Sequence, residues 1–244
     1  MRSKNAQLKR ARIHHHKAHK PNEPVWLFDL DNTLHNTSFR IFEHISLGMT
    51  VAVKEALNID DAQAHLIRRA YWKRYGATVI GMVKHHNVDP HVFLRRSHDF
   101  DVKPLVQAER GIHRKLAQLP GRKVLVTNAP LHYAIAVLKH LRMHRMFDAV
   151  WAIEHLKLHG QYRPKPSVAM MRHIVACEGV KAHRTVLIED TLENLKGARA
   201  AGMRTVHVFH PGTPFAKYAR GRSPYVDMRI KKVSDLLLGK RTLA

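Results

Sequence analysis

Short apolar runs and longer amphipathic stretches alternate along much of the chain. Five runs have the length and composition of buried strands, and they lie at residues 25–30, 124–127, 149–153, 185–188 and 205–208. Apolar residues recur at helical spacing in three further stretches, at residues 131–141, 167–177 and 192–201. This alternation predicts βαβ units and a parallel sheet that is covered by helices on both faces.

The stretch between the first two predicted strands has a different pattern. Apolar side chains recur every four positions from Ile41 to Leu57, which indicates a long helix. A second helix is expected to begin at Asp60 or Asp61. A further helix is expected to open at Pro104 and to run to about residue 119. We therefore expect a mainly helical insertion after the first strand.

These patterns together predict an α/β fold, with a Rossmann-like parallel sheet core and an inserted helical cap domain. The core is expected to comprise residues 25–35 and 116–244, and the cap residues 36–115. Residues 1–24 precede the first strand and form a basic stretch, which we expect to be a disordered tail.

Composition narrows the class of protein. Apolar residues make up 45% of the chain, which is enough for a substantial buried core. The single cysteine, Cys177, excludes a disulfide framework and favours a reducing, cytoplasmic location. No run approaches the roughly 18 apolar residues that a membrane-spanning helix needs, so we expect no membrane partner.

The net charge of +23 is unusual, and it arises from 42 Lys and Arg against 19 Asp and Glu. Residues 1–23 carry seven Lys or Arg and one acid, and residues 216–244 carry eight and two. Such a balance favours anionic substrates. It also predicts that any contact of these basic tails with RNA is weak and non-specific.

Two carboxylates, Asp29 and Asp31, stand at the end of the first predicted strand. Residues two apart on a strand face the same side. Carboxylates held close together repel one another, so this pair requires a shared proton or a divalent cation. A solvated Asp-rich turn is the alternative, and further strand ends weigh against it.

Polar residues also follow the later strands. Thr127 and Asn128 end the second strand and are suited to holding phosphate oxygens. Lys165 stands between two prolines and can balance the charge of a phosphate and a carboxylate, although a surface loop is the alternative. Glu189 and Asp190 directly follow a buried apolar strand, where acids are costly unless a cation such as Mg²⁺ compensates them. Asn194 lies on the first turn of the next helix and can face the same place.

The order of these motifs resembles the haloacid dehalogenase superfamily of phosphohydrolases, over roughly residues 25–210. The resemblance implies that Asp29 attacks phosphorus and that Asp31 acts first as general acid and then as general base. It also implies that Thr127 and Lys165 bind the phosphoryl group. The superfamily's dehalogenases lack an aspartate at the position of Asp31, which favours phosphate chemistry over halide chemistry.

The same resemblance implies that Mg²⁺ is held by Asp29, Asp190 and the backbone carbonyl of Asp31. Glu189 matches an acidic position beside the metal, and Asn194 matches a residue that helps to orient the lysine. Asp31 has to be protonated to help the leaving oxygen depart. We expect burial in a site of low dielectric constant to raise its pKa.

The predicted cap is similar to that of the pyrimidine 5′-nucleotidase branch of the superfamily, in the runs 71–76, 81–86, 88–90 and 98–101. One departure is His35, near the expected entrance to the cap, where the branch more often has Tyr. Three aromatic residues at helical spacing are expected to belong to the core of the cap rather than to stack on a base, and they are Tyr71, Trp72 and Tyr75.

Three functional hypotheses follow. The favoured one is a magnesium-dependent phosphatase that acts on pyrimidine nucleoside 5′-monophosphates through a phospho-aspartate. The second is a phosphatase of the same chemistry for a sugar phosphate or for phosphoglycolate. The third is a nucleic-acid-binding protein on this fold, suggested by the charge of +23. Four acids at one mouth argue against the third, because they would repel a polyanion.

Overall fold

The computed structural model describes residues 23–209 and 223–238, and nearly all of the predicted basic tail at 1–24 lies outside them. A sheet of six parallel strands forms the centre of the protein, in the order β3-β2-β1-β6-β7-β8. The strands are β1 Val25–Phe28, β2 Arg122–Val126, β3 Ala149–Trp151, β6 Thr185–Glu189, β7 Arg204–Val208 and β8 Met228–Ile230. The predicted α/β class with a parallel sheet is confirmed.

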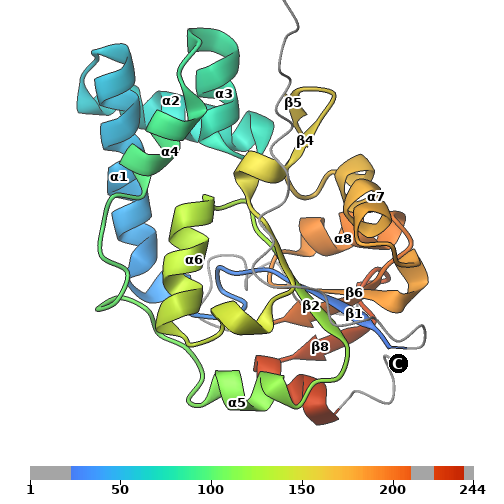
Figure 1. The fold of residues 1–244 in the computed structure, drawn as a ribbon. Coiled ribbons are helices and arrows are strands. Elements are labelled where there is room, and N and C mark those ends of the chain that lie inside the picture. Colours follow the sequence, from blue (N-terminus) through green and yellow to red (C-terminus); the bar gives the residue numbers. More distant parts are fainter. Residues whose placement is uncertain (1–22, 210–222, 239–244) are drawn as a thin grey trace, which may run out of the picture.

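Helices cover both faces of the sheet (Figure 1). Successive residues of β1 point to opposite faces, so Trp26 and Phe28 join one buried cluster while Val25 and Leu27 join the other. Helix α6, Leu131–His140, packs in the first cluster, and helices α7, Val168–Cys177, and α8, Leu192–Ala200, pack in the second. Burial on both faces explains why the strands are almost wholly apolar.

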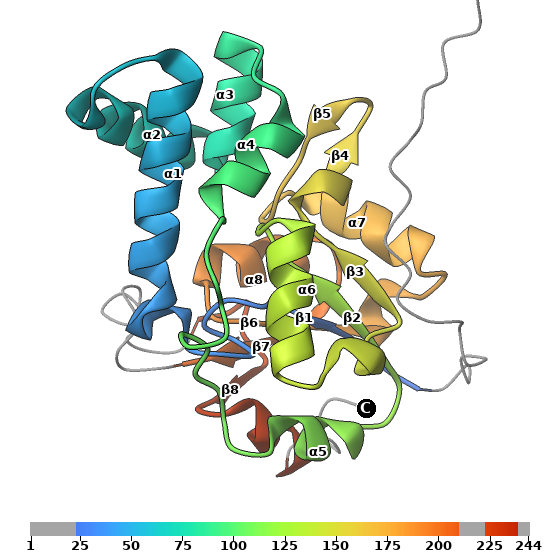
Figure 2. The same cartoon turned by 60° about the vertical axis from the view of Figure 1, so that its left-hand side comes forward.

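Four helices stand together apart from the sheet in both views (Figures 1 and 2). They are α1 Ile41–Leu57, α2 Asp61–Tyr75, α3 Thr78–His86 and α4 Pro90–Ser97. Their apolar faces meet in a third buried cluster, which includes Val53, Met82 and Phe93. Asp60 and Asp89 cap α2 and α4 by accepting hydrogen bonds from backbone N–H groups of the first turn.

The helix expected to open at Pro104 is shorter than predicted. Helix α5 spans only Ile112–Ala117. Gly111, directly before it, has a φ of +70°, which interrupts any continuous helix. Ile112 and Leu116 pack in a sheet cluster rather than among the four helices. The segment between α4 and α5 therefore returns from the four helices to the core through turns and irregular chain.

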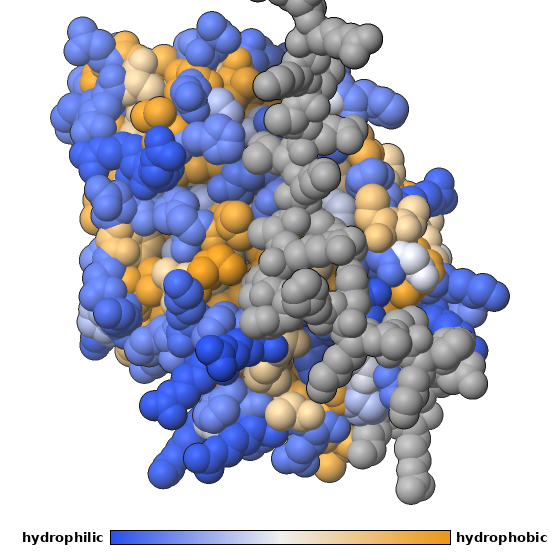
Figure 3. All heavy atoms as spheres, in the orientation of Figure 1, coloured by the Kyte–Doolittle hydropathy of each residue, from blue (hydrophilic) through white to orange (hydrophobic). Residues whose placement is uncertain are grey.

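A short antiparallel hairpin, β4 Lys157–Leu158 and β5 Gln161–Tyr162, leads into the loop that contains Lys165. The face seen in Figure 3 is mostly hydrophilic, with smaller apolar areas between charged side chains. No helix within the described residues is long and apolar enough to cross a membrane.

Candidate active site

The topology of the sheet places the candidate residues at one crevice. In the sheet, β2 and β3 lie on one side of β1, and β6, β7 and β8 lie on its other side. The order in which strands are added therefore reverses between β1 and β6. Ligands bind outside the carboxyl ends of the strands at such a switch point. Asp29 directly follows β1, and its N–H donates to Ile188 of β6 at 3.0 Å. Glu189 is the last residue of β6, and Asp190 directly follows it.

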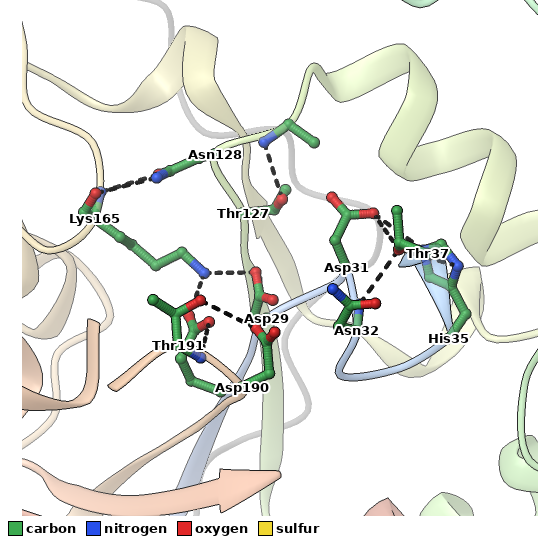
Figure 4. A network of polar contacts seen from close by, with 12 residues as sticks. Asp29, Asp31, Asn32, His35, Thr37, Thr127, Asn128, Lys165, Asp190 and Thr191 are labelled. Atoms are coloured by element: carbon green, nitrogen blue, oxygen red, sulfur yellow. Dashed lines mark hydrogen bonds and ion pairs between the residues drawn. The ribbon is translucent and has the colours of Figure 1, made fainter. Parts of the chain in front are cut away.

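Lys165 enters this crevice from the loop before α7 (Figure 4). Its Nζ lies 2.5 Å from Asp29 Oδ1 and 2.6 Å from Glu189 Oε2. The lysine is 3% exposed, so water screens these contacts very little. Burial alone would lower the pKa of Lys165, but the two carboxylates outweigh it and raise the pKa above its usual value. Lys165 is therefore a fixed positive charge at the centre of the site.

Three carboxylates surround this one ammonium. Oxygens of Asp29, Glu189 and Asp190 lie within 4.8 Å of one another. Burial, followed by the charge of Glu189, raises the pKa of Asp29 to about 7. Burial and the charges of Glu189 and Asp29 raise the pKa of Asp190 to about 9. Burial is the larger cause of both pKa shifts and the neighbouring carboxylates add to it, so the residues present fit a hard divalent cation with oxygen ligands such as Mg²⁺.

The side chain of Asp31 points away from Lys165, toward the loop that follows it (Figure 4). Its Oδ1 accepts hydrogen bonds from Thr37 and Tyr133, each at 2.8 Å, and lies 3.2 Å from His35 Nε2. Burial raises the pKa of Asp31, but these donors, His35 foremost, lower it below its usual value. The expectation of a raised pKa is therefore wrong, because it considered burial and omitted the hydrogen bonds.

Thr127 and Asn128 follow β2 and differ in what they contact. Thr127 is 1% exposed, and its hydroxyl accepts the N–H of Ala129 at 3.0 Å while keeping its own hydrogen to donate. The amide of Asn128 pairs with the backbone of Lys165, at 2.9 Å to the N–H and 3.1 Å to the carbonyl. Asn128 thus holds the lysine loop against the end of β2. Its binding of phosphate stays a prediction.

Three further residues that the sequence singled out are Asn194, His35 and Trp72. Within the described residues, Asn194 is half-buried and its side chain makes no hydrogen bond to Lys165, so its orienting role stays a prediction. The side chain of His35 is fully buried against Asp31, and its influence on substrate preference stays a prediction. Trp72 is 54% exposed, so its assignment to the core of the cap is wrong.

Sequence analysis missed Tyr133 as a site residue. A tyrosine on the apolar face of a helix was a usable signal, because a buried hydroxyl requires a hydrogen-bond partner.

Comparison with known proteins agrees with this geometry. The sequence profile described as haloacid dehalogenase-like hydrolase matches residues 26–208. The chain belongs to this family. The match starts within β1 and ends with β7, so it includes every candidate residue.

Two curated relatives of this hydrolase belong to different organisms. The phosphate metabolism protein 8 of Saccharomyces cerevisiae is 24% identical over 202 residues, which are 78% of this chain and 62% of the yeast protein. The chain therefore spans less than two thirds of that relative. The fructose-1-phosphate phosphatase YqaB of Escherichia coli is 26% identical over 198 residues, 75% of this chain and 94% of the relative.

Solved structures share the fold. A phosphatase of the family from Thermococcus onnurineus matches with a TM-score of 0.61 and 19% identity, over 90% of this chain and 97% of its own. CbbY from Rhodobacter sphaeroides, solved with phosphate, matches with a TM-score of 0.59 and 20% identity, over 88% and 96%. At 19% and 20% identity, this likeness shows that the fold is shared and nothing more.

Proposed function

We propose that this hydrolase is a phosphatase that cleaves small phosphomonoesters with the help of Mg²⁺, and that Asp29 is its nucleophile. The observation that carries the proposal is the buried contact of Lys165 with Asp29 and Glu189, beside Asp190, at the switch point of the sheet. Three carboxylates and one ammonium leave a net charge of about −2, which a divalent cation balances, and the ammonium and the bound cation can then together attract the anionic oxygens of a phosphate ester.

The proposed reaction has two steps. A carboxylate oxygen of Asp29 attacks phosphorus and the ester P–O bond breaks. Asp31 gives a proton to the departing alkoxide, and for this step the negative charge of the bound ester has to raise the pKa of Asp31 from its lowered value. Lys165 and the Thr127 hydroxyl hold the phosphoryl oxygens. Water then attacks the phospho-aspartate while Asp31 takes one of its protons, which releases inorganic phosphate and restores Asp29.

The metal is proposed to bind Asp29, Asp190 and the backbone carbonyl of Asp31. When bound, Mg²⁺ reduces the repulsion between the phosphate and the Asp29 carboxylate. Glu189 stays paired with Lys165 at 2.6 Å and keeps the ammonium beside the nucleophile.

Pyrimidine nucleoside 5′-monophosphates are the proposed substrate class, and the similarity of the cap sequence to that branch supports them. Sugar phosphates are the second candidate, favoured by the 26% identity that extends over 94% of the fructose-1-phosphate phosphatase of E. coli. The positive charge of the chain suits either class, because both are small anions. A cytoplasmic location stays an expectation from the single cysteine.

Phosphate release from a substrate panel tests the proposal. The panel contains UMP, CMP, fructose 1-phosphate and phosphoglycolate, each measured with Mg²⁺ and with EDTA. We expect turnover that requires Mg²⁺, with kcat/KM highest for UMP or CMP. Asp29→Asn is the control, and it should keep the fold and lose at least about a thousandfold in kcat. Turnover by a folded Asp29→Asn protein refutes the nucleophile, and a preference for fructose 1-phosphate selects the second substrate class.

A further inference from the structure

The carboxyl group of Asp31 receives all of its identified donors on one of its two oxygens. Oδ1 accepts hydrogen bonds from the hydroxyls of Tyr133 and Thr37, each at 2.8 Å, and His35 Nε2 lies 3.2 Å away. In the parts of the chain that the structure describes, Oδ2 has no such partner. The protein environment therefore distinguishes the two oxygens.

Tyr133 is held firmly enough to orient its acceptor. It lies on the sheet-facing side of α6 and is 1% exposed. Its ring packs against two others, and its centroid lies 5.3 Å from that of His98 and 6.1 Å from that of Phe100. Close packing around a buried aromatic ring restricts its change of rotamer. Its hydroxyl therefore presents a donor to Asp31 at a fixed place.

Thr37 and His35 complete the set from the opposite side. The Thr37 hydroxyl accepts the N–H of Asn32 at 3.3 Å, so its own hydrogen is directed to Asp31. The side chain of His35 is fully buried and lies 3.2 Å from the same Thr37 oxygen through Nε2. Asp31 is thus held between α6 and the loop that follows β1.

The donors decide where a proton on Asp31 resides. A carboxylic acid carries one proton, and an oxygen that already accepts several hydrogen bonds has no lone pair left for it. When Asp31 is protonated, Oδ2 is therefore the oxygen that carries the proton. In Figure 4, the Asp31 oxygen without dashed lines lies on the side of the carboxyl that faces Thr127, while the bonded oxygen faces Thr37.

We propose that Tyr133 is a positioning residue for the general acid: it fixes the Asp31 carboxyl so that Oδ2, the oxygen without these donors, faces the leaving oxygen of a bound phosphate ester. This inference rests on the proposed phosphatase function. It assigns the hydroxyl of Tyr133 no contact with substrate and no proton transfer of its own.

Dependence on the leaving group tests it. An alkyl phosphate such as UMP needs a proton on its leaving oxygen, whereas p-nitrophenyl phosphate releases a stable anion. We expect Tyr133→Phe, which keeps the ring, to lower kcat/KM for UMP about ten- to a hundredfold and for p-nitrophenyl phosphate by less than about threefold. Asp31→Asn should show the same selectivity, and adding Tyr133→Phe to it should change little. Tyr225→Phe, before β8 at the other edge of the sheet, is the matched control.

Equal losses on both substrates, or no loss, overturn the proposal, because a general disturbance of the fold does not distinguish leaving groups. A crystal structure of Tyr133→Phe supplies a readout independent of turnover. We expect the Asp31 carboxyl to rotate from its position between Thr37 and α6. An unchanged Asp31 refutes the positioning role even if the wild-type protein proves to hydrolyse no phosphate ester.

Discussion

Lys165 supplies the positive charge at the centre of the site. Because it is buried, the two carboxylates that contact it have it as their compensating charge in place of water. Asp29 and Glu189 both lie within 2.6 Å of its ammonium. A buried carboxylate that loses such a partner keeps its full desolvation cost. The same lysine therefore links the stability of the core to the chemistry of the crevice.

Replacement of Lys165 tests this link. We expect Lys165→Met to abolish turnover and to lower the free energy of unfolding of the metal-free protein by about 3–5 kcal/mol, because two buried carboxylates lose their partner. Adding Glu189→Gln should recover part of the stability and none of the activity. Urea denaturation in EDTA measures both variants. Equal stability of the single and double variants would contradict the account.

Single residues of the site were predictable to different degrees. Asp29, Glu189 and Asp190 could be found because acids at the ends of apolar strands are costly and conspicuous. For Tyr133 the apolar helix face signalled a buried hydroxyl but not its partner, since the contact with Asp31 joins residues 102 positions apart and depends on how α6 lies on the sheet. The lowered pKa of Asp31 was missed because the turn that brings His35 and Thr37 onto its carboxyl is not evident from the sequence.

At the scale of elements, the loop with Lys165 depends on α8. Gly197 lies in α8 where a Cβ would collide with the backbone oxygen of Pro166. The helix thus approaches the loop more closely than any side chain at this position allows. Asn128 holds the same loop from the end of β2. Helix α8 and the residue that follows β2 therefore together fix the position of Lys165 relative to Asp29.

Gly197→Ala tests the contact. In an ordinary helix this substitution stabilises by up to about 1 kcal/mol. Here we expect it to destabilise by about 1–3 kcal/mol and to lower kcat at least about tenfold, because the loop has to move. Lys196→Ala, at the exposed neighbouring position of α8, is the control and should leave both unchanged. Increased stability with normal kcat would show that the loop does not depend on this contact.

Most elements followed from hydrophobic spacing, but not all of them. The strands at the centre of the sheet were predicted within a few residues, because each is a run buried on both faces. Strand β8 and the short hairpin of β4 and β5 were not predicted, since two or three residues carry no period. The late start of α5 follows from the conformation of Gly111, which spacing alone does not indicate.

At the scale of the whole molecule, the stability of the metal-free protein depends on the negative charge that gathers in the site. Asp29, with a pKa of about 7, and Asp190, with a pKa of about 9, bind protons more tightly in the folded protein than their usual value of 3.8 implies. Between pH 3.8 and about 7 for Asp29, and between pH 3.8 and about 9 for Asp190, the folded state binds more protons than the unfolded state. The metal-free protein therefore loses stability as pH rises through this window.

Mg²⁺ replaces those protons, so its effect on stability should depend on pH. We expect the gain in Tm on adding excess Mg²⁺ to be larger at about pH 8 than at about pH 5.5, where protons compete. Asp190→Asn removes one of the repelling charges, and its gain should be smaller and less dependent on pH. Thermal unfolding by circular dichroism measures each case. An equal gain at both pH values would contradict the proposed ligands.

Trapping of the covalent intermediate tests the central claim most directly. Borohydride reduces an aspartyl phosphate to homoserine, and an acid quench during turnover of UMP preserves the intermediate for that reaction. The account predicts homoserine at residue 29, detected by mass spectrometry of the peptide that contains Asp29, and none in the absence of substrate. Continued turnover with an unmodified Asp29, or homoserine at another aspartate, would contradict it.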